Sequence, residues 1–358
     1  MDQIEDLPDC IEKVELLEQA ILLADEEHQL DHGYYLRQRY IYLANSFGYD
    51  MRMLVAFLWC LEKYDQQPDR FDEHEMLWQF KWIMTDLAGF PQLNREKIEQ
   101  MAKDMRERYE RSGWALGPVW NALSSVHFYL GEWDKSRACK EEVLRSEVDA
   151  MSDCPACRQQ MRVRFFHEAE DYERAIEEAK IIFKSSMRCR TVPERTHQVL
   201  MSTYLKLDQY NESKEHLNRL EQTTVFDLEH YWVWLDIVGV NSYIDLSRAV
   251  QLYLKYFNMI AQQELVYARL QGYLTGAELF QRWLVERPEE TKAMLGFPSK
   301  FEFVSADGDY EVAKLQRWFE EKTFEIAHQF DRRNGNAFFT DRVQRRMKKA
   351  QEWARKAE

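Results

Sequence analysis

The chain has 358 residues, of which 45% are hydrophobic and 31% are charged, with only 12 Gly and 8 Pro. Many charged residues with few turn formers are typical of long helices, so we expect an all-α protein. The net charge of −14 at pH 7 argues against general binding to nucleic acid or to an anionic membrane.

The start of the chain and its cysteines bear on location. No stretch approaches the ~18 consecutive apolar residues of a membrane-spanning helix, and the acidic start MDQIEDLPDC lacks the order of a secretory signal. Six cysteines in so long a chain are too sparse for a disulfide scaffold. We therefore expect a cytoplasmic protein with no membrane partner and mostly reduced thiols.

Residues 1–116 predict degenerate helical hairpins. A helix is expected at 10–28, and YLANSFGYDMRMLVAFLWCLEKY offers a turn at Gly48 inside a second helical pair. The segments HEMLWQFKWIMTDLAGF and REKIEQMAKDMRERYERSG form a further pair around Pro91. Each segment places apolar residues at helical spacing, which predicts amphipathic helices that pack on one another.

Residues 117–258 carry an internal repeat. Small residues at positions 136, 175, 213 and 249 recur at intervals of 39, 38 and 36 residues. A small residue at that point lets a second helix approach the first, so the pattern predicts two antiparallel helices per unit. An aromatic residue stands three positions earlier in the first three units, as Trp133 with Ser136, Tyr172 with Ala175 and Tyr210 with Ser213.

This pattern resembles the tetratricopeptide repeat. Gly131 with Ser136 matches that family's turn glycine and the small residue five positions later, whereas Glu170 and Asp208 replace the glycine in the next two units. The resemblance implies a right-handed superhelix, or solenoid, of helical hairpins with a concave groove lined by the first helices.

Residues 259–358 predict a C-terminal helical region with one irregular loop at 296–310. A helical run from Leu246 to Glu286 precedes this loop, and Gly272 and Gly276 are candidate breaks in it. Asn334-Gly335 is a turn signal before a last helix that begins DRVQRRMKK. That basic helix is interpreted as a solvated helix, with an anion-binding tail as the alternative.

The order of segments along the chain resembles a family of bacterial tetratricopeptide-repeat proteins of actinobacterial type. The segments that carry the likeness are MLWQFKWIMTDLAGFP, SDCPAC, CRTVP and FDRRNGN. The resemblance implies a helical-repeat fold and a bacterial origin, and it implies no activity.

Three cysteines predict a site in the second repeat. Cys154 and Cys157 stand where a first helix begins, and Cys189 follows the second helix, so an antiparallel hairpin brings the three sulfurs to one end. Three thiolates and an imidazole make a closed structural zinc site, with His197 as the first candidate for the fourth ligand and His230 or Glu194 as alternatives. Thiols without metal, a reversible disulfide and thioredoxin-like chemistry stay open, although the last needs a βαβ setting.

The groove predicted from the repeat register offers polar side chains to a peptide. Amides suit a peptide backbone, and arginines suit a carboxylate. The lining residues are Asn121, Ser125 and Tyr129 in the first unit, Gln160, Arg164 and His167 in the second, and Arg195, Gln198 and Ser202 in the third.

We therefore expect a cytoplasmic scaffold or adaptor that binds a peptide or protein partner in its groove. The chain lacks the motifs of phosphate-binding loops, dinucleotide folds, zinc proteases and serine hydrolases, so no enzyme and no required cofactor are expected. A peptide-responsive regulator that acts on other proteins and a zinc- or thiol-dependent sensor are the alternatives.

Overall fold

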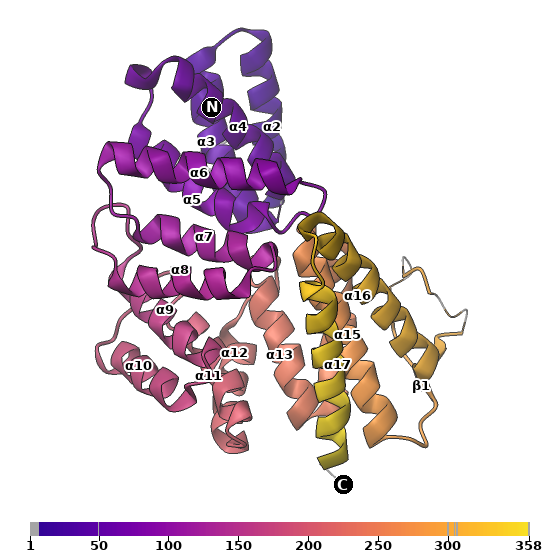
Figure 1. Ribbon diagram of the computed structural model, residues 1–358. Coiled ribbons are helices and arrows are strands. Elements are labelled where there is room, and N and C mark those ends of the chain that lie inside the picture. Colours follow the sequence, from indigo (N-terminus) through magenta and orange to yellow (C-terminus); the bar gives the residue numbers. More distant parts are fainter. Residues whose placement is uncertain (1–6, 49, 299–300, 304, 306, 357–358) are drawn as a thin grey trace. The chain divides into compact units, whose positions relative to one another are not determined.

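The structure is a computed structural model that describes residues 7–48, 50–298, 301–303, 305 and 307–356 (Figure 1). The described chain is helical almost throughout and divides into two compact units. Unit 1 comprises residues 1–152 with 263–266, and unit 2 comprises residues 153–262 with 267–358. The all-α prediction is confirmed. The division falls inside the predicted repeat block 117–258 and not at its ends, and the superhelix stays a prediction.

Unit 1 is a series of helices in which neighbours along the chain pack on one another. Its core contains large side chains that are fully buried, among them Phe57, Phe80 and Tyr109, and the Tyr109 hydroxyl donates to the Leu77 carbonyl at 3.0 Å. The elements are α2 (Ile11–Glu26), α3 (Leu30–Phe47), α4 (Asp50–Gln66), the 3-10 helix η1 (Pro68–Arg70), α5 (Glu73–Leu87), α6 (Arg95–Ser112), α7 (Gly117–Tyr129) and α8 (Trp133–Arg145).

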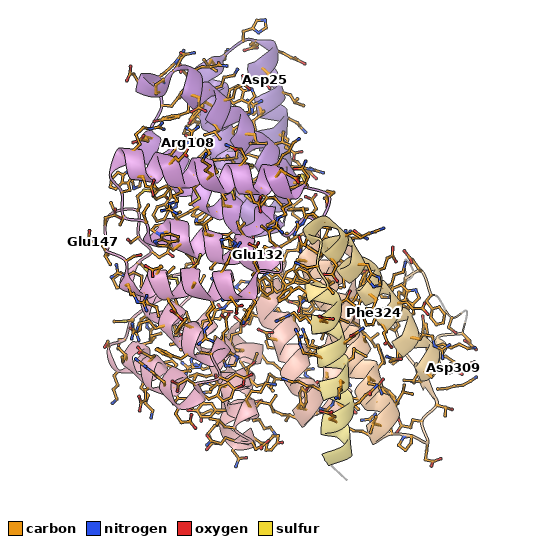
Figure 2. All side chains as sticks on the ribbon, viewed as in Figure 1. Asp25, Arg108, Glu132, Glu147, Asp309 and Phe324 are labelled. Atoms are coloured by element: carbon orange, nitrogen blue, oxygen red, sulfur yellow. The ribbon has the colours of Figure 1, made fainter. Side chains whose placement is uncertain are left out.

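Local signals set the helix ends of unit 1. The Asp72 side chain accepts from the Glu75 N–H and starts α5, and Asn94 starts α6 in the same way. Gly48 and Gly113 end α3 and α6 in the left-handed conformation, with φ of 73° and 74°. Arg108, labelled in Figure 2, is buried and forms ion pairs with Asp65 and Asp104.

Unit 2 begins with three helical hairpins and ends with longer helices. Within it α9 packs on α10, α11 on α12, and α13 on α14, and successive first helices α9, α11 and α13 also contact one another. The elements are α9 (Pro155–Glu168), α10 (Tyr172–Lys184), α11 (Glu194–Lys206), α12 (Tyr210–Thr223), α13 (Tyr231–Ile244), α14 (Leu246–Gln262), α15 (Val266–Glu286), β1 (Lys292–Met294), β2 (Asp309–Glu311), α16 (Val312–Asn334) and α17 (Phe338–Lys356).

The predicted small residues hold the hairpins together. Ser136, Ala175, Ser213 and Ala249 are all 0% exposed. The Ser136 hydroxyl donates to the Ser124 carbonyl at 2.6 Å, and the Ser213 hydroxyl donates to the Met201 carbonyl at 2.7 Å, each twelve residues earlier on the first helix. The repeat position is therefore a close helix contact in all four units, and where it is serine it also makes a buried hydrogen bond.

The turn between the two helices is the same in three hairpins. Gly131, Glu170 and Asp208 take φ of 74°, 61° and 57°, the left-handed region that favours glycine. The residue after each one donates its N–H to a carbonyl five positions earlier, on His127, Phe166 and Tyr204, at 2.8 to 2.9 Å. Glu170 and Asp208 therefore occupy the place of the glycine, as the repeat alignment predicts.

The C-terminal part of unit 2 departs from the sequence prediction at two glycines. Gly272 and Gly276 do not break the helical run, which instead divides into α14 and α15 at residues 263–265. A Cβ on Gly272 would lie 2.4 Å from Ile260 Cγ2, and one on Gly276 would lie 2.3 Å from Tyr253 Oη. These glycines allow α15 to approach α14 closely.

The described residues of the predicted irregular loop at 296–310 follow the short strand β1 and run into the short strand β2, which takes up Asp309 and Tyr310; residues 299–300, 304 and 306 lie outside the described part of the chain. β1 and β2 pair antiparallel, with Ala293 opposite Tyr310. Phe301 is 3% exposed, and its ring stacks on Phe297 at 4.3 Å and on Phe319 at 6.0 Å. The aromatic residues of the loop therefore complete the core beside α16.

Candidate functional site

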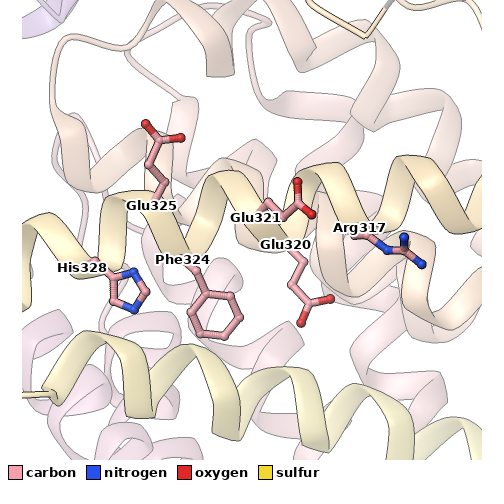
Figure 3. A pocket seen from close by; sticks show the side chains of 6 residues that line it. All are labelled: Arg317, Glu320, Glu321, Phe324, Glu325 and His328. Atoms are coloured by element: carbon pink, nitrogen blue, oxygen red, sulfur yellow. The ribbon is translucent and has the colours of Figure 1, made fainter.

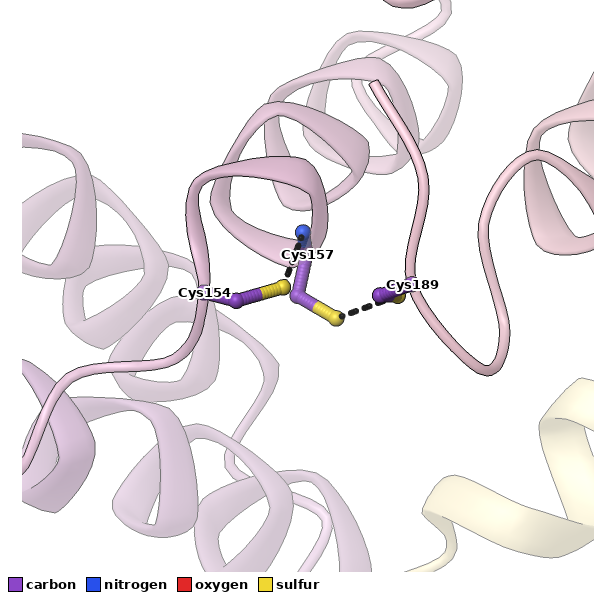
Figure 4. A group of neighbouring side chains, drawn as sticks. All are labelled: Cys154, Cys157 and Cys189. Atoms are coloured by element: carbon purple, nitrogen blue, oxygen red, sulfur yellow. Dashed lines mark hydrogen bonds between the residues drawn. The ribbon is translucent and has the colours of Figure 1, made fainter. Parts of the chain in front are cut away.

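The three predicted cysteines lie together in unit 2 (Figure 4). Cys154 caps the N-terminus of α9, where its Sγ accepts from the Cys157 N–H at 3.5 Å. The Sγ atoms of Cys157 and Cys189 are 3.4 Å apart, and all three sulfurs lie within 4.8 Å of one another. The predicted approach of the three sulfurs is confirmed.

The hairpin core positions these thiols. Ala156, Val163 and Ile182 of α9 and α10 form a buried cluster, and Cys157 and Cys189 pack against its edge. The loop that carries Cys189 is closed by a bond from the Cys189 N–H to the Val192 carbonyl at 3.1 Å. The thiols therefore lie on a packed framework, with Cys154 exposed and the other two half-buried.

The three thiols differ in acidity. Burial raises the pKa of Cys157 to about 12, and its contacts with Cys189 and Cys154 add to this. Burial would also raise the pKa of Cys189, but hydrogen bonds from the Thr191 and Val192 N–H groups, the Cys157 thiol and the Thr191 hydroxyl outweigh it and lower the pKa to about 7. Cys189 is therefore the thiol most ready to ionise near neutral pH.

The structure does not bring the predicted fourth ligand to the sulfurs. Among the described residues, the group of metal-ligating atoms contains the three cysteines and no histidine or carboxylate. His197 points instead to α12, where its Nδ1 lies 2.7 Å from His216 Nδ1. His230 contacts Asp227 and Glu194, and it too lies outside the group. The helical twist turns His197 toward the second helix of its own hairpin.

The predicted groove residues of the first unit lie on α7 in unit 1. Asn121 and Ser125 are half-buried. Tyr129 is only 8% exposed, and its ring lies beside Gly89 and Phe128. Tyr129 is therefore a packing residue and offers little surface to a peptide.

The groove residues on α9 and α11 fall into two sets. Gln160 is 7% exposed and links the two helices through the Arg195 carbonyl and the Thr196 hydroxyl, and His167 bonds to Thr203 at 2.8 Å. These two side chains hold the helices in register. Arg164 and Arg195 are exposed, and Gln198 and Ser202 are half-buried.

Asp236 on α13 continues this exposed set. Gln198 donates to Asp236 Oδ2 at 2.6 Å. Although Asp236 is exposed to solvent, desolvation raises its pKa, against the opposing effects of Gln198, Arg164 and Arg346. Asp236 is therefore open to water and yet surrounded by protein atoms, and we call the polar surface that α9, α11 and α13 share around it the recessed face.

The recessed face carries an excess of positive charge. Desolvation lowers the pKa of Arg195, with repulsion from Arg164 as the next cause. Desolvation also lowers the pKa of the exposed Lys206, with Lys349 and Arg346 of α17 adding to it. Like charges therefore crowd one face of a chain whose net charge is −14.

Sequence reasoning missed the contributions of α13, α15 and α17 to this face. Arg346 of α17 is paired with Glu278 at 2.5 Å and bonds to Gln271 at 2.8 Å, both on α15. The basic run around Arg346 was interpreted as a solvated helix. The sequence signal that could have indicated this contribution is the row of basic residues around Arg346 in an otherwise acidic chain.

A second surface feature lies along α16 (Figure 3). It is shallow and open, and its polar lining is mainly acidic. The side chains follow one another along a single helix: Arg317, Glu320, Glu321, Phe324, Glu325 and His328. Nothing in this row converges on a common point, so it does not form a site.

Comparison of the chain with protein-family models, with curated proteins and with solved structures finds no match. Among the described helices, none combines the length and the apolar character required to cross a lipid bilayer. The geometry of the thiols and of the recessed face therefore carries the functional argument.

Proposed function

We propose that the chain is a scaffold or adaptor of the tetratricopeptide-repeat type, which binds an acidic peptide segment of a partner protein on the recessed face of unit 2. The support from the fold is that successive first helices α9, α11 and α13 contact one another, as the first helices of a repeat superhelix do along its groove. The observation that carries the proposal is that Arg164, Arg195 and Asp236 are exposed to solvent and yet surrounded by protein atoms that desolvate their charges.

The charge of the face selects the partner. Arg195 and Lys206 are each destabilised as cations by desolvation and by neighbouring positive groups. A carboxylate placed beside Arg195 and Arg164, or beside Lys206, relieves the local repulsion, and an arginine can hold it with two hydrogen bonds. Asp236 and the half-buried Gln198 supply acceptors and donors for a peptide backbone. The preferred ligand is therefore an extended peptide with glutamate, aspartate or a free C-terminal carboxylate.

A pair of matched charge reversals tests this proposal. Arg164 on α9 has a side chain 69% exposed and pairs with Glu168 four residues on, and Arg137 on α8 is 57% exposed and pairs with Glu141 in the same way. We expect Arg164→Glu to weaken binding of a fluorescein-labelled glutamate-rich peptide at least about tenfold, since a rim charge becomes repulsive. Arg137→Glu should bind like the wild type in the same anisotropy titration.

Two outcomes contradict the proposal. The first is equal binding of the glutamate-rich peptide and a lysine-rich peptide of the same length. The second is equal loss of binding in Arg164→Glu and Arg137→Glu, which would place the interaction in the overall charge and not on the recessed face.

The alternative of a peptide-responsive regulator uses the same face. Its distinguishing property is that the bound peptide changes the affinity of the chain for a second protein. A zinc- or thiol-dependent sensor is favoured by a separate observation, the approach of three sulfurs within 4.8 Å.

A further inference from the structure

We propose that Cys154, Cys157 and Cys189 form a three-thiolate binding site for a zinc-class cation whose fourth position is open to an external ligand. This inference does not rest on the proposed peptide binding, because its three ligands lie at the end of the α9–α10 hairpin and in the loop that follows it. It differs from the closed site predicted from the sequence, in which His197 completes the tetrahedron.

The sulfur spacing fits one metal ion. Two thiolates on a tetrahedral zinc ion with Zn–S bonds of about 2.3 Å are about 3.8 Å apart. Here Cys157 and Cys189 are 3.4 Å apart and the third sulfur lies within 4.8 Å of both. Small rotations of the half-exposed side chains bring all three onto a common ion. The three cysteines are free thiols, and 3.4 Å is far longer than the about 2.05 Å of a disulfide bond.

The backbone holds the sulfurs as ligands. Cys154 Sγ accepts from the Cys157 N–H at 3.5 Å across a C-P-x-C turn at the start of α9. Cys189 Sγ accepts from the N–H groups of Thr191 and Val192. Hydrogen bonds of this kind orient thiolates and stabilise their charge, which is the usual contribution of the groups around a metal ligand.

A nearby cation can balance the negative charge of the metal-loaded site. Three thiolates and one divalent cation leave a net charge of −1. Arg195 lies within electrostatic range of both Cys157 and Cys189. A guanidinium that is otherwise crowded by Arg164 therefore gains a counter-charge when the site is loaded.

The fourth position has no ligand from the described residues. No histidine, carboxylate or further thiol of the described chain lies within the group, and Cys154 is exposed. Open coordination of this kind is a property of reactive zinc sites, where water or an incoming group completes the tetrahedron.

Metal binding by the reduced full-length chain tests the inference. We expect one equivalent of Zn²⁺ by competition with a chromophoric chelator, and Co²⁺ should give a strong thiolate-to-cobalt absorption band in the near ultraviolet. Cys154→Ser, Cys157→Ser and Cys189→Ser should each weaken Zn²⁺ binding by at least about a hundredfold, since loss of a direct ligand exceeds the effect of a supporting group.

Cys10→Ser is the matched control. Cys10 is half-buried and also stands at the N-cap of a helix, α2, and it has no place in the thiol group. The Cys10→Ser variant should bind one equivalent of Zn²⁺ with unchanged affinity. Cys154 is exposed, so the Cys154→Ser variant should fold even if substitution of the half-buried Cys157 or Cys189 prevents folding. Circular dichroism of each variant checks this.

Three results would overturn the inference. The reduced protein could bind neither Zn²⁺ nor Co²⁺, or the three serine variants could all bind like the wild type. For the open position, addition of imidazole should change the visible spectrum of the cobalt form, and an unchanged spectrum would show that the coordination is already closed.

Discussion

In unit 2, the hairpins α9–α12 and the helices α14–α16 bring neighbouring helices into close contact in different ways. In the hairpins, one small residue per unit lets the helices meet, as Ala175 and Ser213 do. Between α14 and α15, two glycines allow contact with Tyr253 and Ile260. Small residues that recur at a fixed interval form a pattern that can be recognised in the sequence. Glycines that each fit one particular neighbour form no such pattern.

The two regions also differ in what fills the space between helices. Tyr253, Phe280, Phe301 and Phe319 meet ring against ring in the C-terminal core, with centroids 5.5 to 6.3 Å apart. The hairpins add to their apolar core polar links such as Gln160 to Thr196 and a partly buried ion pair between Arg162 and Glu178. We therefore expect larger losses of stability from volume changes in the aromatic core.

The largest effect is expected at the close contact of α15 with α14. Gly272→Ala places a methyl group 2.4 Å from Ile260 Cγ2 and 2.7 Å from the Tyr231 hydroxyl oxygen. We expect a loss of about 3 kcal/mol in the free energy of unfolding, measured by urea titration. Gly239→Ala in α13 is the control, since nothing lies within 4 Å of its Cβ, and it should stabilise by about 0.5 to 1 kcal/mol.

Equal effects of the two substitutions would contradict the view that α15 depends on close helix contact.

The next effect is a loss of stability in acid that depends on His197. Burial lowers the pKa of this 6% exposed imidazole to about 4, with repulsion from His216 as the next cause. The folded state therefore binds the proton less well than the unfolded state. The stabilisation is complete above pH about 6.5 and is lost as the pH falls toward about 4, by at most about 3 kcal/mol.

Urea titrations between pH 7.5 and pH 4.5 measure this loss. His197→Gln keeps a polar side chain beside His216 and has no proton to gain, so its stability should fall less over the same range. A wild type and variant that fall in parallel would exclude His197 as the cause.

A smaller effect is expected at the repeat position itself. Ser213→Ala keeps the helix contact and removes the 2.7 Å bond to the Met201 carbonyl, so we expect a loss of about 1 kcal/mol. Ala175→Ser is the complementary variant, because it offers a hydroxyl at the same position of the second repeat. Thermal unfolding of each variant measures the difference, and no change in Ser213→Ala would mean that the hydrogen bond does not stabilise the hairpin.

The smallest effect is expected at the turns. Glu170 has φ of 61°, so Glu170→Gly should relieve backbone strain and change stability by less than about 1 kcal/mol in the favourable direction. Gly131→Ala at the equivalent turn, with φ of 74°, should destabilise. If both substitutions destabilise equally, the two turns are not equivalent.

The hairpins were predictable from sequence because their spacing repeats. Trp133, Tyr172 and Tyr210 mark the start of each second helix, and the structure begins α8, α10 and α12 at those residues. The roles of Gly272 and Gly276 were not predictable, because a glycine that allows a close contact and one that breaks a helix look alike in sequence. Only the position of the neighbouring helix, here α14, distinguishes the two kinds of glycine.

The candidate site was predictable in part for the same reason. Hairpin topology sufficed to bring Cys154, Cys157 and Cys189 together. It did not fix the direction of His197, because each residue along a helix turns its side chain by about 100°, so a shift of one or two positions decides whether that imidazole faces the sulfurs or His216. The contribution of Arg346 depends on where α17 packs against α15, which no local pattern encodes.

The most direct test of the recessed face is lysine footprinting with an acetylating reagent. Lys206 and Lys349 lie on that face and are exposed, whereas Lys103 on α6 has a side chain 67% exposed in unit 1. We predict that a glutamate-rich peptide slows acetylation of Lys206 and Lys349 and leaves Lys103 unchanged. Protection of all three lysines alike, or of none, would contradict the proposal that the peptide binds this face.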